Sequence, residues 1–280
     1  WECCPREFLR RAIAALDAAS GLHLIAAFEQ EFIYTGVEDR PGHAYSLGAW
    51  RRQGGFGESL IAAFRAAGLK PDSFLPEFGQ RQYEFTITPE PALKAADQAV
   101  IARELVRATA FRLGHRANFS PMPVADGSGN GVHIHFSLHD ASGAPETYDA
   151  DGPLGLSEPA VQFCAGVLHH LPAITAITAP SPVSYLRQDR GAALRVCPVF
   201  DVKGKKKIAE AYNIEFRVSD GSANPYMALG ALIFTGADGI ARKLSLPKHS
   251  GEAPPLPRSL GEALDGMEKS EAVQAWFGPT

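Results

Sequence analysis

The segment 130–138 constrains the fold of this chain more than any other, because apolar and polar side chains alternate along it without a break. Its apolar side chains fall on one face, and His133, His135 and Ser137 fall on the other. Strict alternation predicts a half-buried β-strand, since successive side chains of a strand point to opposite faces of the sheet. Taken alone, the segment is also compatible with two ordinary surface histidines. A strand that buries four apolar groups and exposes two imidazoles and a hydroxyl is nevertheless well suited to present ligands.

Three other segments place ionisable side chains in pairs on predicted strands. These pairs are Glu29 with Glu31, Glu77 with Glu84, and Glu215 with Arg217. If the strands belong to one sheet, five carboxylates and two imidazoles meet on a single concave surface. So many like charges share a poorly solvated pocket only when cations neutralise them. Hard divalent ions with mostly oxygen ligands are therefore expected, either Mg²⁺ or, where an imidazole helps, Mn²⁺.

Arginines gather in the same half of the chain, at Arg187, Arg190, Arg195 and Arg217. Carboxylate-bound divalent ions together with several guanidinium groups are what phosphoryl transfer from ATP requires. The residues alone thus predict a metal-dependent phosphoryl-transfer enzyme. The sequence has neither a Walker P-loop nor the glycine-rich loop of protein kinases, so the nucleotide must be held in another way. The glycine-rich turn 127–131 could bind a carboxylate or a phosphate through its backbone amides.

The rest of the chain predicts a mixture of helices and antiparallel strands. We expect helices at 5–19, 58–67, 91–113, 157–179, 223–244 and 259–277. We expect strands at 22–34, 82–88, 115–120, 130–138, 193–199 and 212–218. Segment 36–57 and the basic run 203–207 are expected to be loops, and 249–258 a proline-rich linker. The absence of a regular βαβ pattern favours the α+β class.

Composition excludes several classes of partner. With 280 residues, a formal net charge of -4 and a pI of about 6.2, the chain offers no electrostatic case for nucleic acid or an anionic membrane. We find no apolar run of membrane-spanning length and no signal peptide. The four cysteines form no C-x-x-C motif, so we expect a reducing, cytoplasmic location. The length allows one large domain or two small ones.

In their order along the chain, these motifs resemble those of the catalytic domain of the glutamine synthetase family. The matching segments are 28–32, 77–84, 129–138, 184–187, 214–217 and 222–226. The resemblance implies a curved, mostly antiparallel half-barrel sheet wrapped by helices, spanning 1–280. It also implies a homo-oligomeric ring with active sites at the subunit interfaces. We expect this chain to correspond to the catalytic domain alone, without the small N-terminal β domain of the family.

The resemblance also implies a role for each site residue. The cation nearer the amino-acid substrate would be held by Glu31, Glu77 and Glu84. The cation that bridges the ATP phosphates would be held by Glu29, His133 and Glu215. The nucleotide would be bound by His135, Ser137 and Asn213, with Arg190 and Arg195 facing the phosphates. The glutamate carboxylates would be bound by Arg187, Arg217 and the backbone of Gly129. The catalytic charge-stabilising groups would be Arg187, Arg190 and Arg217.

The sequence departs from the family pattern at three places. Asn213 stands where the family usually has an arginine that contacts phosphate, and Arg81 stands where it has a glycine. The family also has a flap of a dozen or more residues after the position of Arg187, whereas only two residues separate Arg187 from Arg190 here. Our hypothesis is that the flap exists and that the numbering runs across a break. The Cα distance from Arg187 to Gln188 would test this, because bonded residues lie about 3.8 Å apart.

The implied reaction is ATP-dependent transfer of phosphate to the γ-carboxylate of glutamate, followed by attack of ammonia or an amine to form a γ-glutamyl amide. Three functions stay open. The first is ligation of ammonia, and the second is ligation of a larger amine, such as a polyamine or an aromatic amine, which Asn213 and the altered segment after Arg187 favour. The third is a non-catalytic structural or regulatory protein, which would predict losses among the six cation ligands. A cupin-type barrel would explain the two histidines but not the paired glutamates.

Overall fold

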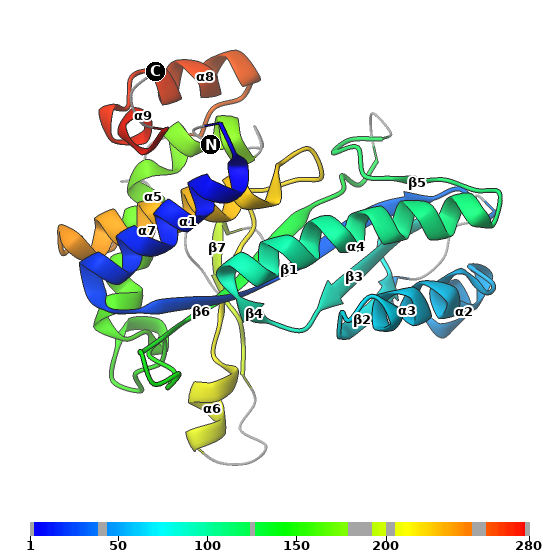
Figure 1. Ribbon diagram of the computed structural model, residues 1–280, viewed down its shortest axis with the longest axis horizontal. Helices are drawn as coiled ribbons and strands as arrows, with labels where there is room; N and C mark the ends of the chain where they lie inside the picture. The colour runs from blue at the N-terminus through cyan, green and yellow to red at the C-terminus, as the bar shows by residue number, and fades with distance from the viewer. Residues whose placement is uncertain are drawn as a thin grey trace.

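The computed structural model describes residues 3–38, 44–123, 127–178, 192–199, 205–247 and 256–277 (Figure 1). Its curved, antiparallel sheet has the strand order β2-β3-β1-β6-β8-β7, and the two short strands β4 and β5 also pair with β1. The strands are β1 (His23–Tyr34), β2 (Pro71–Pro76), β3 (Gln82–Ile87), β4 (Glu90–Pro91), β5 (Ala117–Asn118), β6 (Val132–His139), β7 (Leu194–Val196) and β8 (Ile214–Phe216). The predicted α+β class and the curved sheet wrapped by helices are confirmed.

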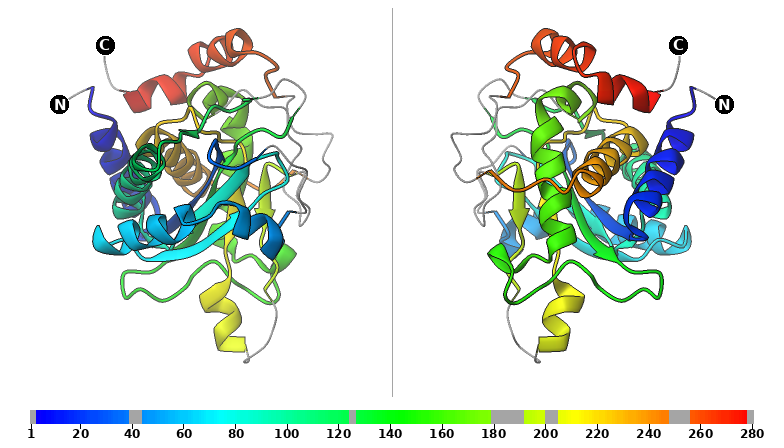
Figure 2. Two further views of the ribbon diagram at one scale, coloured as in Figure 1. Left: turned by 90° about the vertical axis from the view of Figure 1, so that its right-hand side faces the viewer. Right: turned by 90° about the vertical axis from the view of Figure 1, so that its left-hand side faces the viewer.

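Nine helices are seen in the described ranges. They are α1 (Pro5–Ser20), α2 (Leu47–Arg52), α3 (Phe56–Ala66), α4 (Ala92–Arg112), α5 (Glu158–Thr178), α6 (Lys205–Ala211), α7 (Pro225–Ala241), α8 (Leu260–Glu268) and α9 (Glu271–Phe277), with a 3₁₀ turn at Pro153–Gly155. Figure 1 shows α4 running alongside the long strand β1, while α6 stands apart from the other helices. In both views of Figure 2, α8 and α9 lie at the top of the molecule, where α8 packs against α5.

The apolar face of β6 explains why the helices collect on one side of the sheet. Val132, Ile134, Phe136 and Leu138 are all buried, as the alternation predicts. They belong to one large core shared with α1, α5 and α7, while a second core around Phe32 packs α3 and α4 against β1 and β3. Burial of each such side chain contributes roughly 1.5–3 kcal/mol. The polar face of the same strands is therefore left to form a site.

The helices α5 and α7 approach each other closely because both carry glycines at their crossing. A Cβ atom at Gly166 would lie 2.2 Å from the carbonyl oxygen of Thr235, and one at Gly239 would lie 2.2 Å from that of Gln162. Only a residue without a side chain allows two backbones to come this near. Helix α5 also has the length and composition of a membrane span, contrary to our sequence expectation, but 67% of its most apolar window is buried inside the protein. It serves as a core helix.

Five segments differ from the sequence prediction. Segment 36–57 contains α2, whose first turn is capped by Ser46, and β2 was not predicted because Pro71–Pro76 has no alternation. The strand expected at 115–120 pairs over two residues only. The final helix is interrupted at 269–270, where Ser270 caps the start of α9. The basic run was expected to be a loop, yet α6 begins within it at Lys205.

Candidate active site

The register of the sheet brings the predicted acidic and imidazole side chains together on the face opposite the helices. The directly opposed pairs are Glu29 with His133, Glu31 with Glu84, His135 with Glu215, and Arg195 with Glu215. Opposed residues of an antiparallel pair project from the same face, with Cβ atoms about 5 Å apart. Side chains separated by more than a hundred residues thus become neighbours through backbone pairing alone.

Glu29 is the centre of this group. One of its carboxylate oxygens lies 2.6 Å from Nδ1 of His133, and the other lies 3.3 Å from Nε2 of His135. His133 Nδ1 also lies 3.4 Å from a carboxylate oxygen of Glu215. Burial alone would raise the pKa of Glu29, but hydrogen bonds and charges from the two imidazoles outweigh it and lower the pKa. Glu29 is therefore ionised.

His135 has two further contacts on its other ring nitrogen. Nδ1 lies 3.0 Å from Oδ1 of Asn213 and 3.6 Å from the sulfur of Cys197. Burial would lower the pKa of His135, but the contacts with Cys197 and Glu29 raise it to about 11. The ring is held from both sides, so its orientation toward Glu29 is fixed.

Glu31 and Glu84 form the part of the site where negative charge is in excess. Oε2 of Glu31 accepts hydrogen bonds from Nε2 of Gln82 (3.0 Å) and from the backbone N–H of Gly131 (2.9 Å). Burial nevertheless raises the pKa of Glu31. Burial, followed by the charge of Glu29, raises the pKa of Glu84 to about 10. Neighbouring carboxyls whose charged forms are disfavoured by burial and by each other are typical of an oxygen-rich cation site, because a bound cation would offset both effects. The residues therefore fit divalent cations.

Glu215 is the anchor for two arginines. Its carboxylate, in a residue only 1% exposed, accepts a hydrogen bond from Nη1 of Arg195 (2.9 Å) and a second one from Arg217. A carboxylate this deeply buried needs such partners, because an unpaired buried charge costs several kcal/mol. The two guanidinium groups are consequently held at the wall of the site.

Among the described residues, two groups of three side chains each have ligand atoms that all lie within 4.8 Å of one another, as a shared cation would require. They are Glu29 with Glu31 and His133, and Glu29 with His135 and Glu215. The grouping differs from the one that the resemblance implies, since Glu31 is joined by His133 rather than by Glu77 and Glu84. Glu77 instead accepts hydrogen bonds from the Tyr45 hydroxyl (3.3 Å) and from the Phe78 N–H (3.1 Å). Both Glu77 and Glu84 still line the same cavity.

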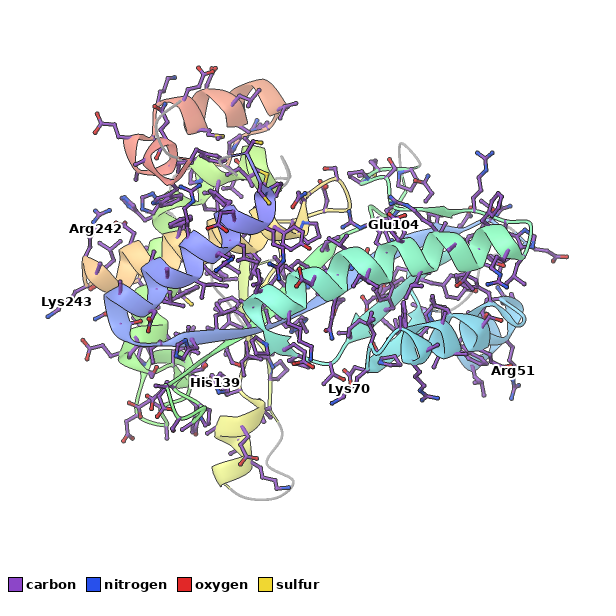
Figure 3. All side chains as sticks on the ribbon, viewed as in Figure 1. Arg51, Lys70, Glu104, His139, Arg242 and Lys243 are labelled. Carbon is purple, nitrogen blue, oxygen red and sulfur yellow. The ribbon has the colours of Figure 1, made fainter. Side chains whose placement is uncertain are left out.

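Two adjoining cavities open on this face and share Glu29, Leu75 and Glu84 in their walls. The smaller, of about 400 Å³, is lined by the predicted acidic ligands together with Gly129, Arg195 and Arg217. The larger, of about 590 Å³, is lined by His135, Ser137, Asn213, Asp72 and Ser73, among others. The Ser137 hydroxyl is 2.9 Å from Nε2 of His139, which Figure 3 labels. The pair of cavities provides room for two different substrates side by side.

Gly129 borders the smaller cavity for a packing reason. A Cβ atom there would lie 2.9 Å from the carbonyl oxygen of Pro121, and the Gly129 carbonyl accepts a hydrogen bond from Nε2 of Gln82 (2.8 Å). The sequence analysis missed Gln82, Tyr45 and Cys197 as members of the site. Gln82 had a detectable signal, since it lies two residues before Glu84 and so shares its face. Cys197 had one as well, since it lies two residues after Arg195 in the predicted strand 193–199, whereas Tyr45 lies in a segment that was expected to be a loop.

Two predicted residues, Arg187 and Arg190, lie outside the described residues, as does the segment in which we hypothesised a missing flap. Arg81 is described, and its backbone lies in the left-handed region with φ of 59°. This explains why a glycine is favoured at that position, since a side chain there costs about 1 kcal/mol or more.

Comparison with protein-family models matches residues 2–280 to the description "Glutamine synthetase, catalytic domain". The chain belongs to the glutamine synthetase family. The resemblance inferred from the motifs is thus confirmed.

Among sequence relatives, the chain is 35% identical over 271 residues to "Gamma-glutamylpolyamine synthetase GlnA3" of Streptomyces coelicolor, covering 88% of this chain and 57% of that protein. It is 35% identical over 240 residues to "Glutamine synthetase" of Pyrococcus abyssi, covering 75% of this chain and 52% of the relative. The chain therefore spans little more than half the length of these relatives.

Among solved structures, "Crystal structure of novel glutamine synthase homolog" superposes with a TM-score of 0.92 at 41% identity, covering 99% of this chain and 68% of the other. "GmaS/ADP complex-Conformation 1" superposes with a TM-score of 0.84 at 26% identity, covering 98% of this chain and 70% of the other.

Proposed function

We propose that the chain is the catalytic domain of an ATP-dependent ligase that forms a γ-glutamyl amide from glutamate and either ammonia or an amine. The observation that carries the proposal is the convergence of carboxylates, imidazoles and two arginines at the junction of two adjoining cavities. Family membership supports the same reaction class. An acyl phosphate intermediate needs both a nucleotide and a carboxylic acid side by side, and two connected cavities provide that arrangement.

Divalent cations fit the acidic part of the site. One would be held by Glu29, Glu31 and His133, with Glu77 and Glu84 in the same cavity wall, and a second by Glu29, Glu215 and an imidazole. We keep Mg²⁺ or Mn²⁺ as the ions, because carboxylate oxygens dominate the donor set. When bound, such ions would neutralise negative charge on the phosphate groups of ATP.

The chemistry would proceed in two steps. An oxygen of the glutamate γ-carboxylate attacks the γ-phosphorus of ATP, and the bond from that phosphorus to ADP breaks, giving γ-glutamyl phosphate and ADP. The lone pair of the amine then attacks the γ-carbonyl carbon, phosphate leaves with the bonding pair, and the amine loses one proton to a carboxylate or to solvent. Arg195 and Arg217 would offset the charge that develops on the transferred group and bind carboxylate, because guanidinium forks match both geometries.

The larger-amine alternative has specific support. The relative that matches 88% of this chain is named for a polyamine substrate, and Asn213 stands in the larger cavity where the family usually has an arginine. The side-chain oxygen of Asn213 contacts the His135 ring, and its uncharged amide does not offer the positive charge with which an arginine would bind phosphate. The six predicted cation ligands are all present, which speaks against the non-catalytic alternative. We also propose a homo-oligomeric assembly, as the family resemblance implies.

The test is ATP turnover with Mg²⁺ or Mn²⁺ and glutamate against ammonium, a polyamine and an aromatic amine, with mass detection of the γ-glutamyl product. We expect ADP release to depend on glutamate and on at least one amine. The variant Glu29→Gln should lose turnover, whereas Glu104→Gln, at an exposed position on α4 labelled in Figure 3, should keep it. No ADP release with any amine would favour the non-catalytic alternative.

A further inference from the structure

Two aromatic side chains stand at the wall of the smaller cavity with unusual exposure. Phe78 is 70% exposed and Tyr45 is 48% exposed, and both line the cavity that contains the carboxylates. Their ring centroids are 5.5 Å apart with the planes at 88°, an edge-to-face pair. A single exposed apolar side chain needs no explanation, but a pair that borders a charged cavity forms a defined apolar surface beside it. We call Tyr45 and Phe78 the aromatic rim.

The aromatic rim is fixed in place by polar contacts with one carboxylate. Oε2 of Glu77 accepts a hydrogen bond from the Tyr45 hydroxyl at 3.3 Å and another from the backbone N–H of Phe78 at 3.1 Å. The backbone N–H of Tyr45 donates to the carbonyl of Pro76 at 2.9 Å. Tyr45 has a φ of 60°, in the left-handed region, which costs a residue with a side chain about 1 kcal/mol. Such strain persists where surrounding contacts hold a side chain in a required position.

The charges around the rim are complementary to a cation. Five carboxylates line the smaller cavity, and one of them, Glu77, is hydrogen-bonded to both residues of the aromatic rim. The face of an aromatic ring also attracts a cation, and its apolar surface accepts a hydrocarbon chain. A ligand with an ammonium group joined to a carbon chain would satisfy both features. Ammonium has no carbon chain, so it would gain the attraction of a cation to the ring but none of the apolar contact with Phe78.

We propose that Phe78, supported by Tyr45, is the specificity-determining surface for the amine substrate, and that this substrate is a primary amine on an alkyl or aryl chain. The inference rests on the proposed ligase function and adds to it the class of amine. Phe78 would contact the carbon skeleton of the amine while Glu77 faces its ammonium end. The rim thus selects among amines and takes no part in phosphoryl transfer.

The test compares the full chain with Phe78→Ala, with the conservative variant Phe78→Tyr, and with Phe111→Ala. Phe111 is a matched control, because it is also an exposed phenylalanine (80%) but lies near the end of α4 and borders neither of the two site cavities. The readout is the ratio of kcat/KM for 2-phenylethylamine, hexylamine and spermidine to kcat/KM for ammonium. We expect Phe78→Ala to lower this ratio about fivefold or more for 2-phenylethylamine and hexylamine, since the lost apolar contact between the ring and the carbon chain is worth about 1 kcal/mol. Phe78→Tyr, which keeps an aromatic ring, should have the same ratio as the wild type, and so should Phe111→Ala.

Calorimetric binding of 2-phenylethylamine to the same variants separates this inference from the proposed function. If the wild type ligates no amine but Phe78→Ala weakens binding of 2-phenylethylamine, the ligase proposal fails and the aromatic rim stands. If ligation occurs but the ratio and the binding are the same in Phe78→Ala, the rim has no role in specificity. Phe78→Ala could instead change the mass of the assembly and lower kcat/KM equally for every amine, including ammonium. This result would show that a second copy of the chain covers Phe78, and it would overturn the inference.

Discussion

Replacing Glu84 by glutamine should stabilise the cation-free protein, although it removes a predicted cation ligand. Glu84 is 6% exposed, and burial together with the charge of Glu29 raises its pKa from 4.5 to about 10. Between these two values the folded protein holds a proton at this position that the unfolded chain has lost. The stability of the cation-free protein therefore falls as the pH rises from about 4.5 toward about 10. A glutamine side chain mimics the protonated carboxyl and removes this loss.

The magnitude follows from the linkage relation. Each pH unit above the unfolded-state pKa costs about 1.4 kcal/mol until the folded-state pKa is reached. At about pH 7.5, three units above the unfolded value, the expected gain for Glu84→Gln is about 4 kcal/mol at most, and smaller to the extent that solvent reaches the site. Below about pH 4.5 wild type and variant should have the same stability.

Urea unfolding in the presence of a chelator, repeated across this pH range, measures the effect. The wild type should lose stability with rising pH, and Glu84→Gln should lose less of it. Added Mg²⁺ should stabilise the wild type more than the variant, because ligand binding to the folded state alone shifts the unfolding equilibrium. Glu104→Gln serves as the control for a surface charge change. A variant that is less stable than the wild type at about pH 8, or one with an unchanged pH slope, would refute the reasoning.

Three further predictions follow from contacts in the site and the core. Glu29→Gln and Glu215→Gln should each lower ATP turnover at least about a hundredfold, as measured by steady-state kinetics. Glu215→Ala should in addition lower the free energy of unfolding by up to about 3 kcal/mol in urea, because it leaves two half-buried guanidinium groups without their carboxylate partner. Gly131→Ala would place a Cβ atom 2.9 Å from Nε2 of His133, so we expect the His133 ring to move. The affinity for Mn²⁺, measured by titration, should then fall about tenfold, and an unchanged affinity would contradict this prediction. Gly166→Ala should lower the thermal stability by about 1–3 kcal/mol, since its Cβ would meet the facing backbone of α7, and a variant as stable as wild type would show that the helices can separate at no cost.

The sequence predicted those parts of the fold and site that depend on local periodicity. The alternation of 132–138 fixed both the buried face and the ligand face of β6, and the spacing of Glu29 and Glu31 placed both on one side of β1. These two strands are long, and their burial patterns follow the period of a strand. The family motifs supplied the order in which the remaining pieces belong together.

Other features depend on contacts between distant segments, which local pattern does not encode. The sequence did not indicate that Glu31 would share a ligand group with Glu29 and His133. Nor did it indicate β2, whose prolines at both ends hide a strand held in place by pairing with β3. The left-handed backbone of Tyr45 and Arg81 was equally invisible, because neither residue type favours that conformation.

The central position of β1 has a consequence for how this site can be lost or altered. A slip of one residue between β1 and β6 would turn Glu29 toward the helices and expose Phe28 to water. The hydrophobic core therefore enforces the geometry of the site, because any mispairing that misplaces the ligands also removes apolar side chains from the core. Substitution of individual side chains on the polar face can change the chemistry of the site, whereas a change in the register of β1 against β6 would also unfold the protein.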